Sequence, residues 1–166
     1  MIGPALSSAA AQALGFVAHL TLAVWLGSII FFSFVSAPAL FKTLGREDAG
    51  RAVRAIFPVY YRLGAACGGI LVAAVALRAL LAPEPRARRG VEAILGSAML
   101  ALTLYAWRVL LPRVEQARLR AEGKDPTDPT NLEQRYFRRL HAQSVRVNAA
   151  VLLLGLLCFT LASIPR

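Results

Sequence analysis

Cysteine, histidine and acidic residues are scarce in this sequence. Its 166 residues include two cysteines, two histidines and nine Asp or Glu. Cys67 and Cys158 lie far apart inside apolar runs, so they fit neither a metal finger nor a disulfide framework. Paired carboxylates, phosphate loops, dinucleotide glycine motifs and nucleophile constellations are also missing. We therefore assign no catalytic residue and expect neither hydrolase nor nucleotide chemistry. The N-terminal stretch MIGPALSSAAAQALG has no basic start, so we expect no secretory signal.

Apolar residues, by contrast, are abundant. They make up 57% of the chain, and the mean hydropathy of +0.57 is rare for a soluble domain of this size. The net charge is +10, from 19 basic and 9 acidic residues. Because the basic residues lie between apolar spans, we expect anionic lipid headgroups of a bilayer, and not nucleic acid, as their partner.

Four apolar stretches are long enough to cross a bilayer. They predict an all-α membrane protein with one domain over residues 1–166, folded as a four-helix transmembrane bundle. The predicted spans cover about residues 13–37, 63–82, 91–111 and 147–164. In the second span, Gly64 and Gly68 form a small-xxx-small pattern that lets helices approach closely in lipid.

The segment between the first two spans is amphipathic. Pro38 marks the end of the first span or a kink in it. From Phe41 to Phe57, basic residues alternate with apolar ones, which predicts a short helix lying on the membrane surface. Pro58 is then expected to open the second span, with Tyr60 and Tyr61 in the interfacial aromatic belt.

The distribution of basic residues predicts the orientation in the membrane. Most of them flank the first and third connections or the start of the last helix: Lys42, Arg46, Arg51, Arg54, Arg113, Arg118, Arg120, Lys124, Arg135, Arg138 and Arg139. The other side has fewer: Arg86, Arg88, Arg89 and Arg166. We therefore place the first and third connections in the cytoplasm and both termini outside, in a multi-pass protein of the bacterial inner membrane.

The last helix carries polar side chains into the start of its apolar span. Asp128, Thr130 or Asn131 is suited to cap it. At 100° per residue, several of its polar side chains share one face, and others from the first three spans reach the same side of the membrane. The resulting candidate ligand site at the inner face comprises His141, Ser144, Asn148, Arg138, Tyr61 and Arg108. It suits a polar or anionic ligand. The alternative is a hydrogen-bonded lock that joins the surface helix to the bundle without a ligand.

A second candidate site lies in the outer leaflet and comprises His19, Met99 and Cys158. These side chains suit a soft metal such as copper(I), although Met99 and Cys158 are equally typical of an inert core. His19 is either a ligand or a histidine bonded to a carbonyl or hydroxyl between helices. His141 should lie roughly 25 Å away in depth, so the two histidines cannot ligate one metal or haem iron. Nearby, Arg78 and Glu92 are expected to pair.

Several motifs resemble a known family. His19, Trp25 and Gly27 form a His-x5-Trp-x-Gly run, which is followed by Phe31-Phe32 and by Pro38-Ala-Leu-Phe41. Further matching motifs are Ala49-Gly50, Tyr60-Tyr61 and Phe137-x2-Leu140-His141-x2-Ser144-x3-Asn148. Together they resemble the transmembrane protein 205-like family of small four-helix membrane proteins, which implies the fold but no chemistry.

The first of these motifs is also similar to copper-resistance D-type proteins and to the haem-binding membrane protoporphyrinogen oxidase. That likeness implies a functional role for His19, but the lysine that accompanies the histidine in the oxidase has no counterpart here.

The residues and the resemblance together leave three classes of function. The first is the handling or efflux of a small solute or metal. Because the span centres are apolar, transport would need a homo-oligomer or a rearrangement. The second is a haem-linked membrane redox protein, with haem or copper as the cofactor. The third is a non-catalytic module that binds lipid or a protein partner.

Overall fold

The computed structural model describes residues 4–81, 86–124 and 130–163, and helices account for nearly all of them. Four long helical stretches follow one another along the chain. They are α1 (Pro4–Ile30) with η1 (Phe31–Ser36) and α2 (Ala37–Thr43), α3 (Arg46–Leu81), α4 (Arg86–Tyr105) with η2 (Ala106–Leu110) and α5 (Leu111–Ala121), and α6 (Leu132–Ser163). Each stretch is long and apolar enough to cross a membrane. The predicted all-α bundle with four spans is confirmed, and the chain has the make-up of a multi-pass membrane protein.

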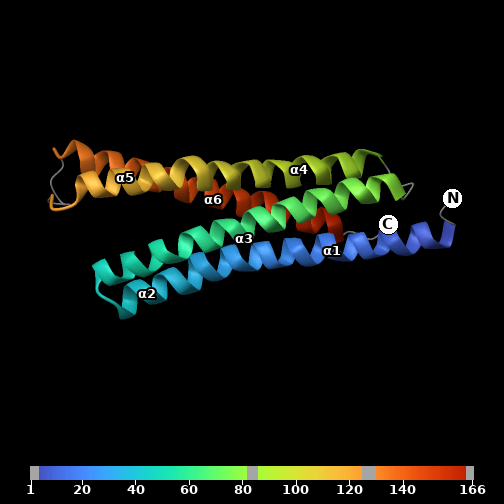
Figure 1. Cartoon of the computed structure of the whole chain (residues 1–166), viewed down its shortest axis with the longest axis horizontal. Helices are drawn as coiled ribbons and strands as arrows, with labels where there is room; N and C mark the ends of the chain where they lie inside the picture. The colour runs from blue at the N-terminus through green and yellow to red at the C-terminus, as the bar shows by residue number, and fades with distance from the viewer. Residues whose placement is uncertain (1–3, 82–85, 125–129, 164–166) are drawn as a thin grey trace.

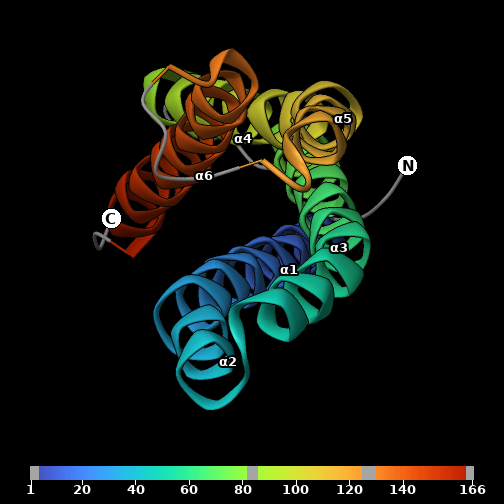
Figure 2. The same cartoon turned by 90° about the vertical axis from the view of Figure 1, so that its left-hand side faces the viewer.

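The four stretches pack as an elongated bundle (Figures 1 and 2). α1 contacts α3 and α6, while α4 lies between α3 and α6. At one end of the bundle lie α2, the start of α3, the end of α5 and the start of α6 (Figure 1). We call this the basic end, because it carries the eleven basic residues that flank the first and third connections and the last helix. α1 begins and α6 ends at the opposite end (Figure 1).

The core is centred on Trp25 of α1, which is 2% exposed. A β-carbon on Gly68 of α3 would come within 2.9 Å of its ring, and one on Gly64 would lie 3.0 Å from its indole nitrogen. On α6, a β-carbon at Gly155 would come within 2.5 Å of Leu26. The Gly64–Gly68 pattern therefore acts as predicted: small residues let α1 approach α3 closely.

The outer surface of the bundle is strongly apolar. Large hydrophobic side chains are exposed along every span, including Phe16, Phe34, Ile94 and Leu153 at 66–69%. A water-soluble protein rarely exposes so much apolar surface, whereas in a bilayer this surface meets acyl chains.

The predicted surface helix at Phe41–Phe57 is wrong. α2 ends at Thr43, the backbone turns at Leu44 and Gly45, and one unbroken α3 runs from Arg46 through Pro58 to Leu81. Two features explain the difference. Glu47 and Asp48 in the first turn favour a helix that starts at Arg46. The apolar face of this segment also packs in the bundle, since Ala49 and Val53 are buried, and does not lie on the membrane surface.

At the same end, the last helix begins with a cap. The side chain of Asn131 accepts hydrogen bonds from the backbone N–H groups of Glu133 and Gln134 at 3.1 and 3.2 Å. Gln134 also donates to the carbonyl of Ala121 at 3.0 Å, and Lys124 pairs with Glu133. These contacts fix the start of α6 against the end of α5. Asn131, one of the three predicted caps, thus caps the helix, and Asp128 lies outside the described residues.

Candidate functional site

A cavity of about 290 Å³ opens at the basic end of the bundle. We call it the inner cavity. Its walls come from η1, α2, α3, α5 and α6, so all four spans contribute. The lining residues are Phe32, Ser33, Ala37, Phe41, Val53, Phe57, Tyr60, Tyr61, Leu111, Val114, His141, Ser144, Val145 and Asn148. This volume is close to the lower limit for cavities that hold small organic molecules.

One wall of the inner cavity is aromatic. Phe32 of η1 packs against Phe57 and Tyr60 of α3, with ring centroids 5.4 and 5.2 Å apart. Phe57 stacks on Tyr61 at 5.9 Å, with an angle of 20° between the rings. Such pairs hold one another in place and present a flat apolar surface. The wall is therefore suited to a planar or unsaturated ligand.

The floor of the cavity carries the hydrogen-bonding groups. The hydroxyl of Tyr60 donates to the side-chain oxygen of Asn148 at 2.5 Å, and the Asn148 amide donates to the hydroxyl of Ser33 at 3.3 Å. The hydroxyl of Tyr61 lies within hydrogen-bonding reach of Ser144. Asn148 thus joins spans one, two and four through side chains alone and forms an interhelical lock, which does not involve the predicted surface helix. The lock and the cavity occupy the same place.

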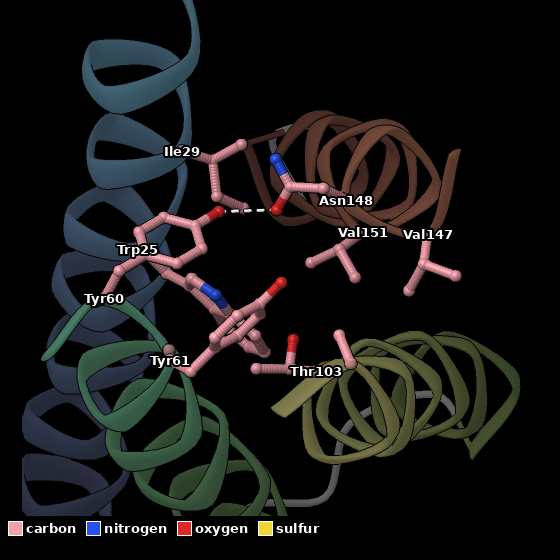
Figure 3. A pocket seen from close by; sticks show the side chains of 10 residues that line it. Trp25, Ile29, Tyr60, Tyr61, Thr103, Val147, Asn148 and Val151 are labelled. Atoms are coloured by element: carbon pink, nitrogen blue, oxygen red, sulfur yellow. Dashed lines mark hydrogen bonds between the residues drawn. The ribbon is translucent and has the colours of Figure 1, made fainter. Parts of the chain in front are cut away.

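Beyond this floor lies a smaller pocket of about 10 Å³, which can hold at most a single water molecule (Figure 3). It shares Tyr60, Tyr61 and Asn148 with the inner cavity. The hydroxyls of Tyr61 and Thr103 point into it, beside the indole nitrogen of Trp25 (Figure 3). The polar lining of the inner cavity therefore ends at the packed core around Trp25.

The predicted inner-site residues divide between two places. His141, Ser144, Asn148 and Tyr61 line the inner cavity, with His141 at its exposed edge and stacked on Phe137 at 6.1 Å. Arg138 is exposed and is not part of this lining, and Arg108 lines a separate groove.

Phe32 and Phe57 of the aromatic wall, and Tyr60 and Ser33, the two partners of Asn148, are absent from the predicted site. The sequence places Tyr60 only in the interfacial belt, although the Tyr60-Tyr61 pair sends its two side chains to neighbouring positions of the same cavity. The signal for Ser33 is a lone hydroxyl within the apolar run Phe31–Val35.

His19 lies near the opposite end and contacts two backbone carbonyls. Its Nδ1 is 2.6 Å from the oxygen of Gly15, one turn earlier in α1, and its Nε2 is 3.3 Å from the oxygen of Ala162. Ala162 belongs to the last turn of α6, where carbonyls lack helical partners. Both ring nitrogens thus lie beside backbone carbonyl oxygens, and a neutral imidazole donates its single N–H to one of them. This arrangement corresponds to the interhelical alternative predicted for His19.

Of the other two predicted members of the outer site, Cys158 shares a cavity with His19 and Met99 does not. His19 and Cys158 line one small cavity of about 20 Å³, along with Arg78 and the buried Glu92. Met99 is fully buried in the core and packs towards Gly155. Among the described residues, no three His, Cys, Asp or Glu side chains are grouped so as to hold a metal ion. His19 and His141 line different cavities, with no lining residue in common.

Comparison with known proteins gives two matches. A family model described as "Domain of unknown function (DUF4149)" matches residues 20–123. A protein of Aquifex aeolicus, described as uncharacterized, is 33% identical over 135 residues, which cover 81% of this chain and 86% of that protein. No solved structure matches. Neither match carries the transmembrane protein 205-like or copper-resistance D name, so those resemblances stay predictions.

Proposed function

This chain belongs to the DUF4149 family, and from its geometry we propose that it binds one small amphiphilic molecule within the membrane. The inner cavity is the binding site. The observation that carries the proposal is the pairing of an aromatic wall with a hydrogen-bonding floor in a cavity of about 290 Å³. A ring bearing a hydroxyl or carbonyl group meets both requirements.

Each part of the cavity contacts a different part of the ligand. Phe32, Phe57 and Tyr61 contact its apolar body. Ser144 and His141, which supply a hydroxyl and an imidazole, bond its polar group, while Asn148 is already engaged by Tyr60 and Ser33.

Binding fits the geometry better than conduction does. The 10 Å³ pocket is backed by Leu22, Trp25 and Ile29, which are 1–2% exposed, and by the fully buried Met99. A solute cannot pass these side chains without separating the helices. Within solute handling, the chain is therefore a carrier or sensor of its ligand in this conformation, and not an open pore.

The metal and haem alternatives lack comparable support. The two ring nitrogens of His19 face carbonyl oxygens, and Met99 lies outside the cavity that holds His19 and Cys158. The sequence predicts the handling of a small solute or of a metal. Of these two, the described residues favour a solute with a polar group.

The test uses two probes that differ in one group, 2-naphthol and naphthalene. The chain has two tryptophans, so a Trp107→Phe background leaves Trp25, next to the cavity floor, as the single reporter of quenching. 2-Naphthol should bind more tightly than naphthalene by about two- to tenfold, the worth of one neutral hydrogen bond. Ser144→Ala should remove most of that difference.

Two matched variants separate binding in the cavity from partitioning into detergent. Ala37→Phe places a large side chain in the cavity, whereas Ala39→Phe adds the same side chain to an exposed position of α2. We expect only Ala37→Phe to abolish saturable quenching. Equal quenching in both variants, or equal affinity for the two probes, would contradict the proposal.

A further inference from the structure

A second hollow lies on the outside of the bundle at the basic end. It is a groove of about 630 Å³ between α3 and the η2–α5 segment, and we call it the arginine groove. Its lining residues are Arg54, Ala55, Pro58, Trp107, Arg108, Leu111, Pro112 and Glu115. The groove and the inner cavity share only Leu111, so they are separate sites. A ligand in one does not require a ligand in the other.

Two guanidinium groups from different helices line this groove. Arg108 of η2 places its guanidinium carbon 4.6 Å from the ring centroid of Trp107, a cation–π contact that orients the side chain. Arg54 of α3 lies over Gly50, where a β-carbon would come within 3.1 Å of its Nη1. Arginines held in this way suit a phosphate group, because the planar guanidinium binds two oxygens at once.

The acidic residue in the groove already has a partner. Glu115 accepts hydrogen bonds from Arg118 at 2.8 and 3.1 Å, one turn further along α5. Arg118 thus compensates the charge of Glu115, and Arg54 also interacts electrostatically with this carboxylate. Arg118 also pairs with Glu122 at 3.6 Å, so Arg54, Arg108, Arg118 and the two glutamates together carry a net charge of +1. A monoanionic phosphodiester complements this charge.

Exposed apolar side chains follow the groove on both helices, together with the exposed Arg62, which donates to the carbonyl of Pro58 at 3.1 Å. Leu104 precedes Trp107 and Arg108 by about one turn on the α4–η2 stretch, and it is 37% exposed. On α3, Val59 follows Pro58 and is 58% exposed. Tryptophan at such a boundary is typical of a membrane interface, where its ring lies at the level of the headgroups. The charged part of the groove is thus placed where a headgroup would be, with an acyl-chain surface beside it.

We propose that the arginine groove is a specific site for one anionic phospholipid. Arg54 and Arg108 bind its phosphodiester, Trp107 packs against its glycerol region, and its acyl chains follow the α3–α4 surface. The occupant is a lipid and not a soluble phosphate, because the lining joins two arginines to tryptophan, alanine and proline surface that only an acylated ligand covers.

The experiment is lipid competition measured by native mass spectrometry of the full chain. Phosphatidylglycerol and phosphatidylcholine with identical acyl chains are offered at equal concentration. Wild type should retain one phosphatidylglycerol in preference to phosphatidylcholine. Arg54→Gln with Arg108→Gln should reduce that preference by about thirtyfold, the effect expected of two basic residues near a membrane surface. The matched control, Arg139→Gln with Arg146→Gln, removes two exposed arginines of α6 and should leave the preference nearly unchanged.

A second measurement keeps the test decisive if the double variant folds poorly. Phosphatidylglycerol brominated on its acyl chains should quench wild-type tryptophan fluorescence more than brominated phosphatidylcholine does, and Trp107→Phe should abolish that excess. Three results would overturn the proposal: equal retention of the two lipids, a lipid preference that follows the α6 arginines, or displacement of phosphatidylglycerol by millimolar inorganic phosphate.

Discussion

Asn148 is the polar side chain that ties the basic end of the bundle together. It accepts a hydrogen bond from Tyr60 of α3 and donates one to Ser33 of η1, so it joins three of the four spans. In a bilayer an unpaired amide is costly, because no water reaches it. A residue that lines the inner cavity therefore also holds its walls at a fixed separation.

We expect Asn148→Leu to destabilise the protein more than Arg146→Gln does. The first change leaves the Tyr60 hydroxyl without its acceptor, which costs roughly 1–3 kcal/mol when that hydroxyl stays buried. Arg146 is exposed on α6, near a span end, where its side chain can reach water. Its replacement should therefore change the thermal stability little.

The measurement is thermal unfolding of both variants in one detergent, with and without added anionic lipid. A neutral Asn148→Leu together with an unfolded Arg146→Gln would mean that the faces of α6 are assigned the wrong way round.

At the scale of elements, the two π-helical segments shape both sites. In η1 the N–H of Ala37 bonds to the carbonyl of Phe32, and in η2 the N–H of Leu111 bonds to that of Ala106, each five residues back. A proline follows each widened turn by one residue, at Pro38 and Pro112. Proline offers no N–H to the preceding turn, and such π-segments are frequent at functional sites. η1 supplies Phe32 and Ser33 to the inner cavity, while η2 supplies Trp107 and Arg108 to the arginine groove.

Replacing Pro38 should therefore separate stability from binding. Pro38→Ala restores a backbone donor and favours an ordinary α-helical turn, which moves Phe32 and Ser33 relative to Asn148. We expect weaker binding of 2-naphthol without a loss of thermal stability. Pro58→Ala is the control, because Pro58 lies in α3 without a π-segment and outside the inner cavity. Unchanged naphthol binding in Pro38→Ala would show that the π-segment does not set the shape of the cavity.

The elements are more predictable from sequence than their joints are. Apolar length alone locates four spans, and the Gly64–Gly68 pattern locates a close contact between α1 and α3. Pro38 indicates an end or a kink, but the sequence does not say that the turn widens, and the hydrogen bond from Asn148 to Ser33 of η1 spans 115 positions of sequence. The surface helix is a wrong prediction for a similar reason. Amphipathic residues 46–57 suit a membrane surface and a bundle end equally, and burial of Ala49 and Val53 decides between them.

The site is predictable where helix periodicity applies and not elsewhere. Ser144 and Asn148 share a face because they are four residues apart, and the structure places both in the inner cavity. Tyr60, by contrast, reaches Asn148 across 88 positions of sequence, and no local pattern encodes that contact. Arg108 is grouped with Ser144 and Asn148 only because it lies at a similar depth in the predicted membrane. Its side chain lines the arginine groove and not the inner cavity.

At the scale of the whole molecule, the two ends of the bundle are chemically unlike. The basic end carries the inner cavity and the arginine groove, while the opposite end closes with the His19 contact to the last turn of α6. The turn at Gly123 belongs to the basic end, and α1 begins and α6 ends at the other (Figure 1). If basic residues are retained in the cytoplasm, both candidate sites face the cytoplasmic leaflet.

Reporter fusions test this orientation directly. Green fluorescent protein inserted at Gly123, a turn residue with a φ of 76°, should fluoresce, and alkaline phosphatase at the same position should be inactive. The same pair of reporters fused after Arg166 should give the reverse result, because α6 crosses the membrane between the two positions. The physical reason is the excess of arginine and lysine around the first and third connections, which the membrane potential and the translocation machinery hold inside. An active phosphatase at Gly123 would mean that the predicted orientation is reversed and that both sites face the outer leaflet. The four spans and their packing would not be affected. Phosphatase activity at both positions would be the more serious result, since an even number of crossings between Gly123 and the C-terminus contradicts α6 as a span.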